Sequence, residues 1–465
     1  MKRAPAAHPQ PKRGASAGGA AAAAAAASKK PSKVAKRAAR TSGEEEEERA
    51  PWTEQLAGAL ALVRPSGAFA CDGLMQNVPA YAPAVTVEGV GRLALPLSAD
   101  QAASLRAVAE PAPFGRGTET VVDEAVRRAL QVPAARLTVG PAGWAAALAH
   151  TVARAVAALG VANAAAQGIT AQVDKLILYE PGGHFQPHKD TEKATGMFAT
   201  LVVQLPVEGG HEGGELVIRH CGQRVRVDFA ASSKLTPLHF AAFYADCTHE
   251  LTPVTSGTRL ALLYNLVRTK PSSEPLPAPA DTSGVDAALC AAARAWAAAG
   301  PGSRPRVALR LEHEYTESSI SFASLKGRDA AKMRALVGCP LLDVRLALVD
   351  KVVTGTADDP GYGCDDDFGG DADAEGLEMQ DVDSTELTTV KWIAPKGRPT
   401  VTLDDFSDEE LLDDSETLRD IDGEPDEREY EGYQGNYAGT LTFTYHTTLA
   451  VVWPVARAQE VTKPA

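Results

Sequence analysis

Residues 174–204 read DKLILYEPGGHFQPHKDTEKATGMFATLVVQ, and this stretch predicts the fold of the middle of the chain. Apolar alternation indicates a strand that ends at Tyr179, and a glycine-containing turn and a second β-type run follow. Side chains two apart in extended backbone point the same way, so His188 and Asp190 should converge while Lys189 points away. The stretch therefore predicts two strands joined by a loop that presents an imidazole and a carboxylate together.

A second stretch, HFAAFYADCTHELTPVTSGTRLALLY at residues 239–264, supplies His249 and, ten residues later, Arg259. A lone His-x-Asp triplet is most often an ordinary loop, but a distant histidine completes a ligand set of two imidazoles and one carboxylate. Such a set suits Fe(II) and leaves coordination positions open. A guanidinium at the start of the next strand can pair with both oxygens of a carboxylate ligand.

Together these residues resemble the Fe(II)/2-oxoglutarate-dependent dioxygenase superfamily, in particular its prolyl 4-hydroxylase-type catalytic domain. That family has a tyrosine nine residues before the first histidine, and a basic residue ten after the last one. Tyr179 and Arg259 stand at those positions here. Arg259 departs from the collagen-type prolyl hydroxylases, which carry lysine there. The resemblance covers about residues 165–270.

The resemblance implies a role for each residue. His188, Asp190 and His249 would be the metal ligands, Arg259 would pair with the far carboxylate of 2-oxoglutarate, and Tyr179 would donate a hydrogen bond to that cosubstrate. It also implies Fe(II), 2-oxoglutarate and O₂ as cofactors, with ascorbate as a further candidate. The reaction would hydroxylate a substrate and release succinate and CO₂.

Other polar residues near the site have two alternative roles. Thr200 either reaches the cosubstrate or packs in the core. Lys189, Glu192 and Lys193 are expected at the mouth, in contact with substrate or solvent. Histidines not expected to bind metal are His150, His184, His211, His313 and His446, of which His184 and His211 are predicted to be at the surface.

Many short strands with turn residues between them favour a β-dominated α+β fold. We expect a double-stranded β-helix (jelly roll) with flanking helices, plus a second β-rich domain. A hairpin is expected at residues 83–97, followed by a helix capped by Ser98, and another helix at 143–167. The predicted divisions are a disordered basic, Ala-rich tail (1–50), an N-terminal supporting region of strands and helices (51–165), the dioxygenase jelly roll (166–270), a linker and helix (271–299), and a C-terminal β-rich domain (300–465) with an acidic disordered insertion at 356–432.

The net charge of −14 is unevenly distributed over the 465 residues. Residues 1–42 contain ten Lys/Arg and no acid, whereas residues 358–431 contain 27 of the 60 acids and five Lys/Arg. The basic cluster at 29–40 reads as a nuclear-localisation signal, an organelle transit peptide or a solubilising tail. No apolar run is long enough for a membrane span, and the six widely spaced cysteines have no C-x-x-C. These features favour a nuclear or cytoplasmic protein with free thiols.

The leading hypothesis is therefore a 2-oxoglutarate-dependent dioxygenase that acts on a protein or peptide, with a peptidyl proline or similar side chain as target. One alternative is a nucleic-acid or small-molecule oxidative demethylase or hydroxylase of the same superfamily. Nucleic acid is disfavoured as a partner because the body of the chain is acidic. A second alternative is a non-catalytic binding or sensor protein whose acidic insertion contacts basic partners.

Overall fold

The computed structural model describes a large part of the chain beyond residue 50. The described residues are 51–79, 83–116, 119–161, 164, 167–234, 238–270, 283–300, 302–357, 377–399, 401, 403, 410–412, 425–431 and 439–462. The predicted tail at 1–50 lies outside them, as do residues 271–282 of the predicted linker and helix at 271–299. Residues Ala50–Ala465 form one compact unit.

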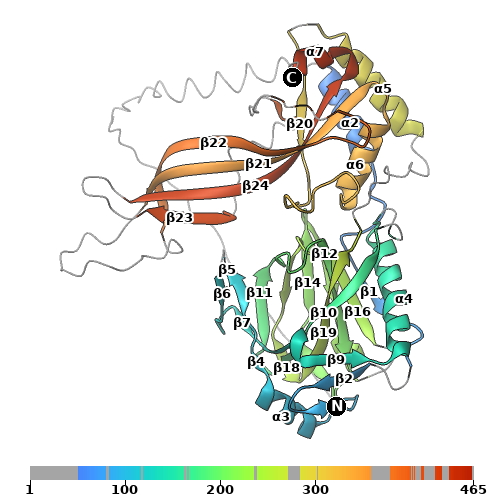
Figure 1. Cartoon of the computed structure of the whole chain (residues 1–465), viewed down its shortest axis with the longest axis vertical. Coiled ribbons are helices and arrows are strands. Elements are labelled where there is room, and N and C mark those ends of the chain that lie inside the picture. Colours follow the sequence, from blue (N-terminus) through green and yellow to red (C-terminus); the bar gives the residue numbers. More distant parts are fainter. Residues whose placement is uncertain are drawn as a thin grey trace, which may run out of the picture. The chain divides into compact units, whose positions relative to one another are not determined.

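The helices and the short 3₁₀ turns lie between and beside the strands (Figure 1). The helices are α2 Pro51–Ala61, α3 Ala99–Val108, α4 Ala142–Ala158, α5 Ser283–Ala297, α6 Gly327–Gly338 and α7 Ala458–Val461. The 3₁₀ turns are η1 Ala134–Arg136, η2 Ala230–Ser232 and η5 Val455–Arg457.

Two antiparallel sheets form the jelly roll. One has seven strands, in spatial order β1 (Ala70–Leu74), β16 (His239–Tyr244), β12 (Met197–Leu205), β19 (Arg259–Arg268), β10 (Ile169–Tyr179), β8 (Leu130–Pro133) and β4 (Glu110–Pro111). The other has five, in the order β15 (Gln223–Val227), β14 (Leu216–His220), β17 (Thr248–Leu251), β11 (His184–His188) and β7 (Arg127–Arg128). Their facing side chains form a common apolar core.

Smaller sheets complete this half of the fold. They are β3 (Gly91–Arg92), β2 (Ala84–Val87) and β9 (Leu137–Gly140); β13 (His211–Gly213) with β18 (Val254–Gly257); and β5 (Phe114–Arg116) with β6 (Glu119–Val121). The β2–β3 hairpin is the one predicted at 83–97. Ser98 caps α3 as predicted, because its hydroxyl accepts a hydrogen bond from the Gln101 backbone N–H.

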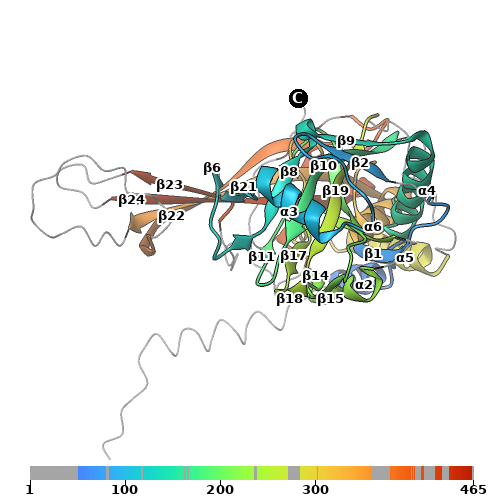
Figure 2. The ribbon, with the colours of Figure 1, turned by 90° about the horizontal axis from the view of Figure 1, so that it is seen from below.

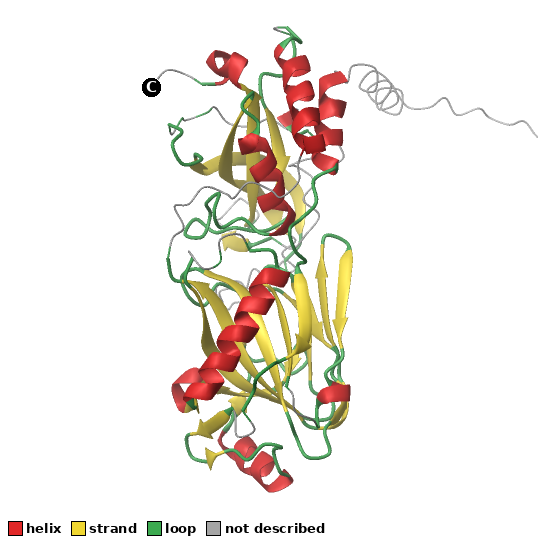
Figure 3. Cartoon of the chain, turned by 90° about the vertical axis from the view of Figure 1, so that its right-hand side faces the viewer, coloured by secondary structure: helices red, strands yellow, loops and turns green. Residues whose placement is uncertain are grey.

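Helix α4 packs on the outer face of the seven-stranded sheet (Figure 3). Trp144 Nε1 donates to the Tyr264 hydroxyl at 3.2 Å, and the Tyr244 hydroxyl donates to the Leu159 carbonyl at 2.6 Å. The helix ends at Ala158, earlier than the predicted residue 167, because Gly160 adopts a φ of 69° that closes it. The helix therefore braces the sheet from outside and leaves the space between the two sheets free.

Strands from the predicted N-terminal supporting region extend both sheets. β1, β4 and β8 belong to the seven-stranded sheet, and β7 belongs to the five-stranded one. The edge of the jelly roll therefore does not coincide with the proposed boundary at residues 165/166. Helix α2 packs against α5 instead, where Trp52 stacks on Trp296 with ring centroids 4.3 Å apart.

The C-terminal region forms a further sheet, visible as a ribbon of long strands in Figures 1 and 2. Its order is β20 (Val307–Arg310), β24 (Thr440–Pro454), β21 (Leu342–Ala357) and β22 (Met379–Ile393), and β23 (Glu427–Glu431) pairs with β24. Alternate residues of β21 and β24 face two apolar clusters, one with α2, α5 and α6, the other with Trp392, Leu403 and Leu411.

Two of these strands lie inside the insertion that the sequence predicted to be disordered. β22 and β23 fall within residues 356–432, and both pair with long strands of the sheet. The high density of acidic residues suggested disorder, but β22 is a largely exposed strand whose backbone hydrogen bonds come from its pairing with β21. The rest of the insertion lies outside the described residues.

The architecture is thus β-dominated α+β, a jelly roll with flanking helices and a second β-rich region, as the sequence predicted. In the part of the chain that the structure describes, no helix is long and apolar enough to cross a membrane.

Candidate functional site

A cavity of about 300 Å³ opens between the two sheets of the jelly roll. Its walls include His188 and His249 from the five-stranded sheet, and Tyr179, Thr200 and Arg259 from the seven-stranded sheet. The sequence-predicted site residues, Asp190 included, therefore all line one space, although they are up to 80 residues apart along the chain.

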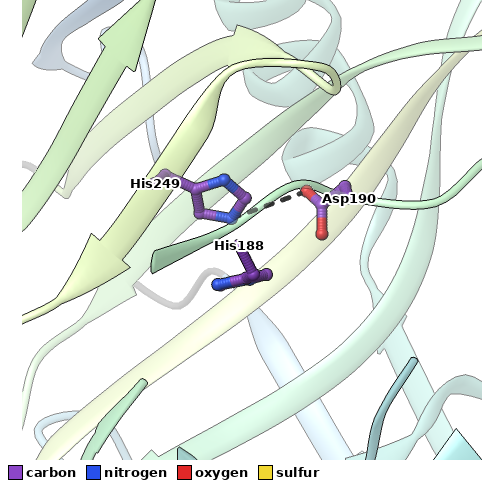
Figure 4. A group of neighbouring side chains, drawn as sticks. All are labelled: His188, Asp190 and His249. Atoms are coloured by element: carbon purple, nitrogen blue, oxygen red, sulfur yellow. Dashed lines mark ion pairs between the residues drawn. The ribbon is translucent and has the colours of Figure 1, made fainter. Parts of the chain in front are cut away.

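Strand pairing brings the two histidines together. β11 pairs with β17, and His188 stands directly opposite His249, with ring centroids 4.2 Å apart. Asp190 follows β11, and its Oδ2 lies 3.8 Å from His249 Nε2 (Figure 4). One ligand atom from each of the three residues lies within 4.8 Å of the other two. The structure thus assembles the cluster that the sequence predicted.

Hydrogen bonds fix which nitrogen each imidazole presents. His188 Nδ1 lies 2.8 Å from the Gln186 carbonyl, and His249 Nδ1 lies 3.0 Å from the Cys247 carbonyl. A carbonyl accepts only, so Nδ1 carries the hydrogen in both rings and Nε2 keeps its lone pair. This arrangement orients metal-binding histidines. Burial and the nearby His249 lower the pKa of His188 to about 3, so its ring is neutral at neutral pH.

Asp190 is held as an anion in a buried position. Burial alone would raise its pKa, but electrostatic interactions with His249, Lys193 and His188 and a hydrogen bond from Thr200 lower it to about 2. Thr200 Oγ1 donates to Asp190 Oδ2 at 2.5 Å. Thr200 therefore orients the carboxylate, a contact that sequence reasoning did not foresee when it weighed cosubstrate contact against packing.

Arg259 is a buried cation that has no anionic partner among the described residues. Its side chain is 2% exposed, it forms no ion pair with a carboxylate of the described residues, and its Nε has no hydrogen-bond partner there. The guanidinium lies 5.0 Å from the Phe229 ring centroid and 5.5 Å from that of Tyr179, its register partner on β10. Burial lowers its pKa to about 10, so it stays charged at neutral pH. An unpaired buried charge of this kind is costly, and an anionic ligand would offset the cost.

Gly214 leaves room beside Arg259. Its φ is +66°, and a Cβ there would lie 2.9 Å from Val254 Cγ2 and 3.3 Å from Arg259 Cδ. A glycine is therefore required both by the backbone and by the close approach of the arginine.

His211 was predicted to be at the surface, and this prediction is wrong. The residue is 4% exposed, because β13 pairs with β18 and places it opposite Gly257. Its Nδ1 lies 3.2 Å from the Gly213 carbonyl, whereas Nε2 has no partner among the described residues. Burial and the charge of Arg259 lower its pKa to about 4, which makes His211 a neutral neighbour of the guanidinium.

The charged residues predicted at the mouth contact protein groups rather than only solvent. Lys189 pairs with Glu314, Lys193 with Asp174 at 3.0 Å, and Glu192 accepts from the Thr316 hydroxyl at 2.9 Å. Two of these partners belong to the C-terminal region. His150 and His184 are exposed and half-buried respectively, and neither joins a metal-binding cluster in the described chain.

Sequence reasoning missed two further features. Lys175 lines the cavity, where its ammonium donates to Gln131 at 2.9 Å and burial lowers its pKa to about 8. A second cluster, His220, Asp246 and His313, also has ligand atoms within 4.8 Å of one another. No sequence signal marks that cluster, because its three residues stand on segments with no shared spacing.

A jelly roll that places two histidines and an aspartate between its sheets is typical of oxygenases with a single non-haem iron. Residues 175–267 match the family model of the 2OG-Fe(II) oxygenase superfamily, so this segment of the chain is similar to that superfamily. This agrees with the resemblance seen in the sequence. No curated protein matches the chain.

Several solved structures are similar to this chain at low identity. A Pseudomonas putida prolyl-4-hydroxylase is 17% identical, with 47% of this chain and 100% of that chain covered and a TM-score of 0.27. A Trichoplax adhaerens prolyl hydroxylase in complex with a hypoxia inducible factor peptide fragment is 14% identical, with 49% and 92% covered and a TM-score of 0.28. The α-ketoglutarate-dependent epimerase SnoN from nogalamycin biosynthesis is 17% identical, with 46% and 80% covered and a TM-score of 0.25.

The superfamily uses Fe(II), 2-oxoglutarate and O₂, and the cavity fits these groups. Two imidazoles and one carboxylate suit ferrous iron, and Arg259, which has no carboxylate partner among the described residues, suits a dicarboxylate.

Proposed function

We propose that the protein is a 2-oxoglutarate-dependent dioxygenase that hydroxylates a protein side chain, with a peptidyl proline as the first candidate. The observation that carries the proposal is the buried Arg259, which has no carboxylate partner within the described chain and shares a cavity with the His188–Asp190–His249 cluster. A pocket that pairs three metal-binding groups with an unsatisfied cation fits a metal and a dicarboxylate bound side by side. The proline target comes from the sequence resemblance.

His188, Asp190 and His249 would hold the iron. When bound with its cosubstrate, Fe(II) supplies the activation of O₂ that oxidises a C–H bond of the substrate. The contribution of the chain is to keep the two Nε2 lone pairs and the Asp190 carboxylate turned to one point. The Gln186 and Cys247 carbonyls and the Thr200 hydroxyl do this through the hydrogen bonds described above.

Arg259 would bind the far carboxylate of 2-oxoglutarate in a bidentate pair, and Tyr179 would donate a hydrogen bond to it. The aromatic and aliphatic walls exclude water around this pair, which strengthens the attraction between guanidinium and carboxylate. His211 is buried and neutral, so it would place no second positive charge beside the guanidinium. These contacts would orient the cosubstrate before the protein substrate enters.

Two finer assignments also belong to this proposal. Ascorbate, as a reductant that keeps the iron ferrous, is a candidate accessory cofactor. A nuclear or cytoplasmic location is proposed from the basic cluster at residues 29–40.

A binding or sensor protein without activity is the second candidate function. The intact ligand set and the unpaired arginine favour the enzyme, since a protein that had lost catalysis would have no need to keep a costly buried cation.

The test is turnover of 2-oxoglutarate by the purified full chain with Fe(II) and O₂, followed by mass spectrometry of a peptide panel. The proposal predicts succinate formation and a product heavier by one oxygen atom on a peptide. Absence of succinate under all conditions, with iron bound, would favour the non-catalytic candidate.

A further inference from the structure

A second cavity, of about 670 Å³, adjoins the loop that carries the metal-binding residues. It shares Lys189, Asp190 and Thr191 with the site cavity, so the two spaces meet at this loop. Its far wall consists of residues 310–317, Ser319, Lys326, and side chains of β21, β22 and β24. That wall lies outside residues 175–267, the segment that matches the superfamily. We call this second cavity the groove.

The groove is lined mainly by acidic residues. Its wall contains three cations, Lys189, Arg310 and Lys326. Against them stand eight carboxylates: Asp190, Glu192, Asp246, Glu312, Glu314, Glu317, Asp350 and Asp426. The lining therefore favours a cationic occupant and opposes a polyanion such as RNA or DNA.

Several of these carboxylates are already neutralised by neighbouring cations. Asp246 accepts from Lys326 and His313, both at 2.8 Å, and Glu314 pairs with Lys189. Glu312 lies 3.2 Å from Lys332 and 3.4 Å from Arg328, and Glu317 lies 3.6 Å from Lys391. These ion pairs connect residues of the groove wall, and their carboxylates are largely neutralised before any ligand binds.

Three others have no Lys or Arg partner in the described part of the chain. Asp350 accepts from His446 Nδ1 at 2.7 Å, Asp426 accepts from the His446 backbone N–H at 2.7 Å, and Glu192 accepts from hydroxyls and a backbone N–H. Asp350 and Asp426 thus form, around His446, a negative site that no Lys or Arg of the described residues contacts in an ion pair, although Lys189 lies near enough to Asp426 to interact with its charge. Hydroxyls of Thr316, Ser319, Thr447 and Thr448 and the apolar Leu311 and Leu348 also line the groove. Such a mixed surface suits polypeptide backbone and side chains.

From this arrangement we propose that the groove binds the protein substrate beside the reacting residue and selects a basic segment, with lysine or arginine seated at Asp350 and Asp426. The inference rests on the proposed dioxygenase function and names its substrate class. A residue of the segment would enter the site cavity past Lys189–Thr191, and the flanking residues would extend along the groove. The C-terminal region would thereby contribute specificity to a site whose chemistry lies wholly in the jelly roll.

The test uses three fluorescein-labelled peptides of equal length, each with one central proline and with flanks of Lys/Arg, Ser/Gly or Asp/Glu. Binding to the full chain, loaded with Fe(II) and 2-oxoglutarate without O₂, is followed by fluorescence anisotropy. Two or three ion pairs of roughly 0.5 kcal/mol each predict about tenfold tighter binding of the basic peptide than of the neutral one at low salt. The preference should shrink as salt rises.

Asp350→Asn with Asp426→Asn should abolish most of the preference. Asp381→Asn with Glu386→Gln, two exposed acids of β22 outside the groove lining, is the matched control and should keep it. If the double variant does not fold, Asp350→Asn and Asp426→Asn are tested singly, and each should weaken the preference.

Equal binding of the three peptides would overturn the inference, and so would a charge preference that survives the groove variant. A labelled RNA of similar length that outcompetes the basic peptide would also overturn it. Failure of the proposed function looks different: no 2-oxoglutarate turnover by the wild-type chain, whatever the peptides do.

Discussion

The chain contains two clusters of the same composition, His188–Asp190–His249 and His220–Asp246–His313, and they differ in what surrounds the carboxylate. Asp190 faces a cavity, and among the described residues its carboxylate accepts one hydrogen bond, from Thr200. Asp246 instead accepts from the Lys326 ammonium and from His313, so both of its oxygens are already engaged.

This difference teaches that a set of donor residues does not by itself make a metal site. The Lys326 ammonium lies 2.8 Å from Asp246, where a metal ion would have to bind, and its charge would repel that ion. In the first cluster both histidines are anchored through Nδ1 and keep Nε2 free. In the second cluster, the Nδ1 of His313 forms its hydrogen bond with the Asp246 carboxylate itself. The first cluster is therefore the one we propose as the metal site, whereas the second joins the C-terminal region to the jelly roll.

The largest expected effect comes from His188→Ala or Asp190→Ala. Either change removes one of three ligands, and we expect loss of tight Fe(II) binding and of 2-oxoglutarate turnover. His220→Ala is the matched control from the second cluster and should keep both. Iron content after dialysis and succinate formation measure the outcome, and unchanged turnover in His188→Ala would refute the site assignment.

Asp246→Asn should instead act on stability. It leaves the buried Lys326 without its anion, which is expected to cost about 3–5 kcal/mol of the free energy of unfolding. Urea unfolding followed by tryptophan fluorescence measures this cost. Asp190→Asn should lower the free energy of unfolding much less, because no ammonium of the described residues lies at hydrogen-bond distance from the Asp190 carboxylate. Equal losses in the two variants would contradict the contrast between the clusters.

Arg259→Ala should raise the 2-oxoglutarate requirement steeply. A buried carboxylate that loses its charged partner costs on the order of 2–5 kcal/mol in binding, while the iron ligands stay in place. Titration of 2-oxoglutarate against turnover or by calorimetry shows the effect, and Arg259→Lys should restore part of it. An unaltered apparent affinity would mean that Arg259 has another role.

Thr200→Val tests the orientation of Asp190. The substitution keeps the size of the side chain but removes the donor, and we expect iron affinity to fall about tenfold, as is typical for partners of metal ligands. Metal titration with the wild-type chain as reference measures the change. Wild-type iron affinity with weakened 2-oxoglutarate binding would instead favour the cosubstrate role predicted from the sequence.

The smallest effect is expected at His446. Burial disfavours its charged form, but the hydrogen bond and charge of Asp350, with Asp426 and Glu427, outweigh burial and raise its pKa. A pKa that is higher in the folded state stabilises the protein, and the full stabilisation is present at pH values below the unfolded-state pKa of about 6.5. The stabilisation disappears as the pH rises through the folded-state pKa.

His446→Gln should therefore destabilise the protein at acidic pH, by less than about 1 kcal/mol because the site is half exposed, and should have no such effect at high pH. Thermal unfolding of both proteins from pH 5.5 to 9 measures the difference. A difference that does not change with pH would show that the imidazole charge is not involved.

The sequence predicted the parts of the site that depend on local spacing. His188 ends β11, Asp190 follows it by two residues, and Arg259 begins β19 ten residues after His249, so local spacing together with the family resemblance was sufficient to propose them. Burial of His211, by contrast, depends on the pairing of β13 with β18, and nothing in the neighbouring residues signals it.

The same limit explains the misjudged parts of the fold. The packing of Trp52 on Trp296 joins helices more than 200 residues apart, which no local pattern records. Within the acidic insertion, charge suggested disorder, whereas β22 gains its structure from a neighbouring strand that the composition of residues 356–432 does not reveal.

The central claim is that one of the two similar clusters binds iron together with 2-oxoglutarate. Anaerobic titration of the full chain with Fe(II) and 2-oxoglutarate tests it directly through the visible charge-transfer absorption of chelated Fe(II). The account predicts one such centre per chain, lost in His188→Ala and kept in His220→Ala. No absorption in the wild-type chain, or loss of it only in His220→Ala, would contradict the account.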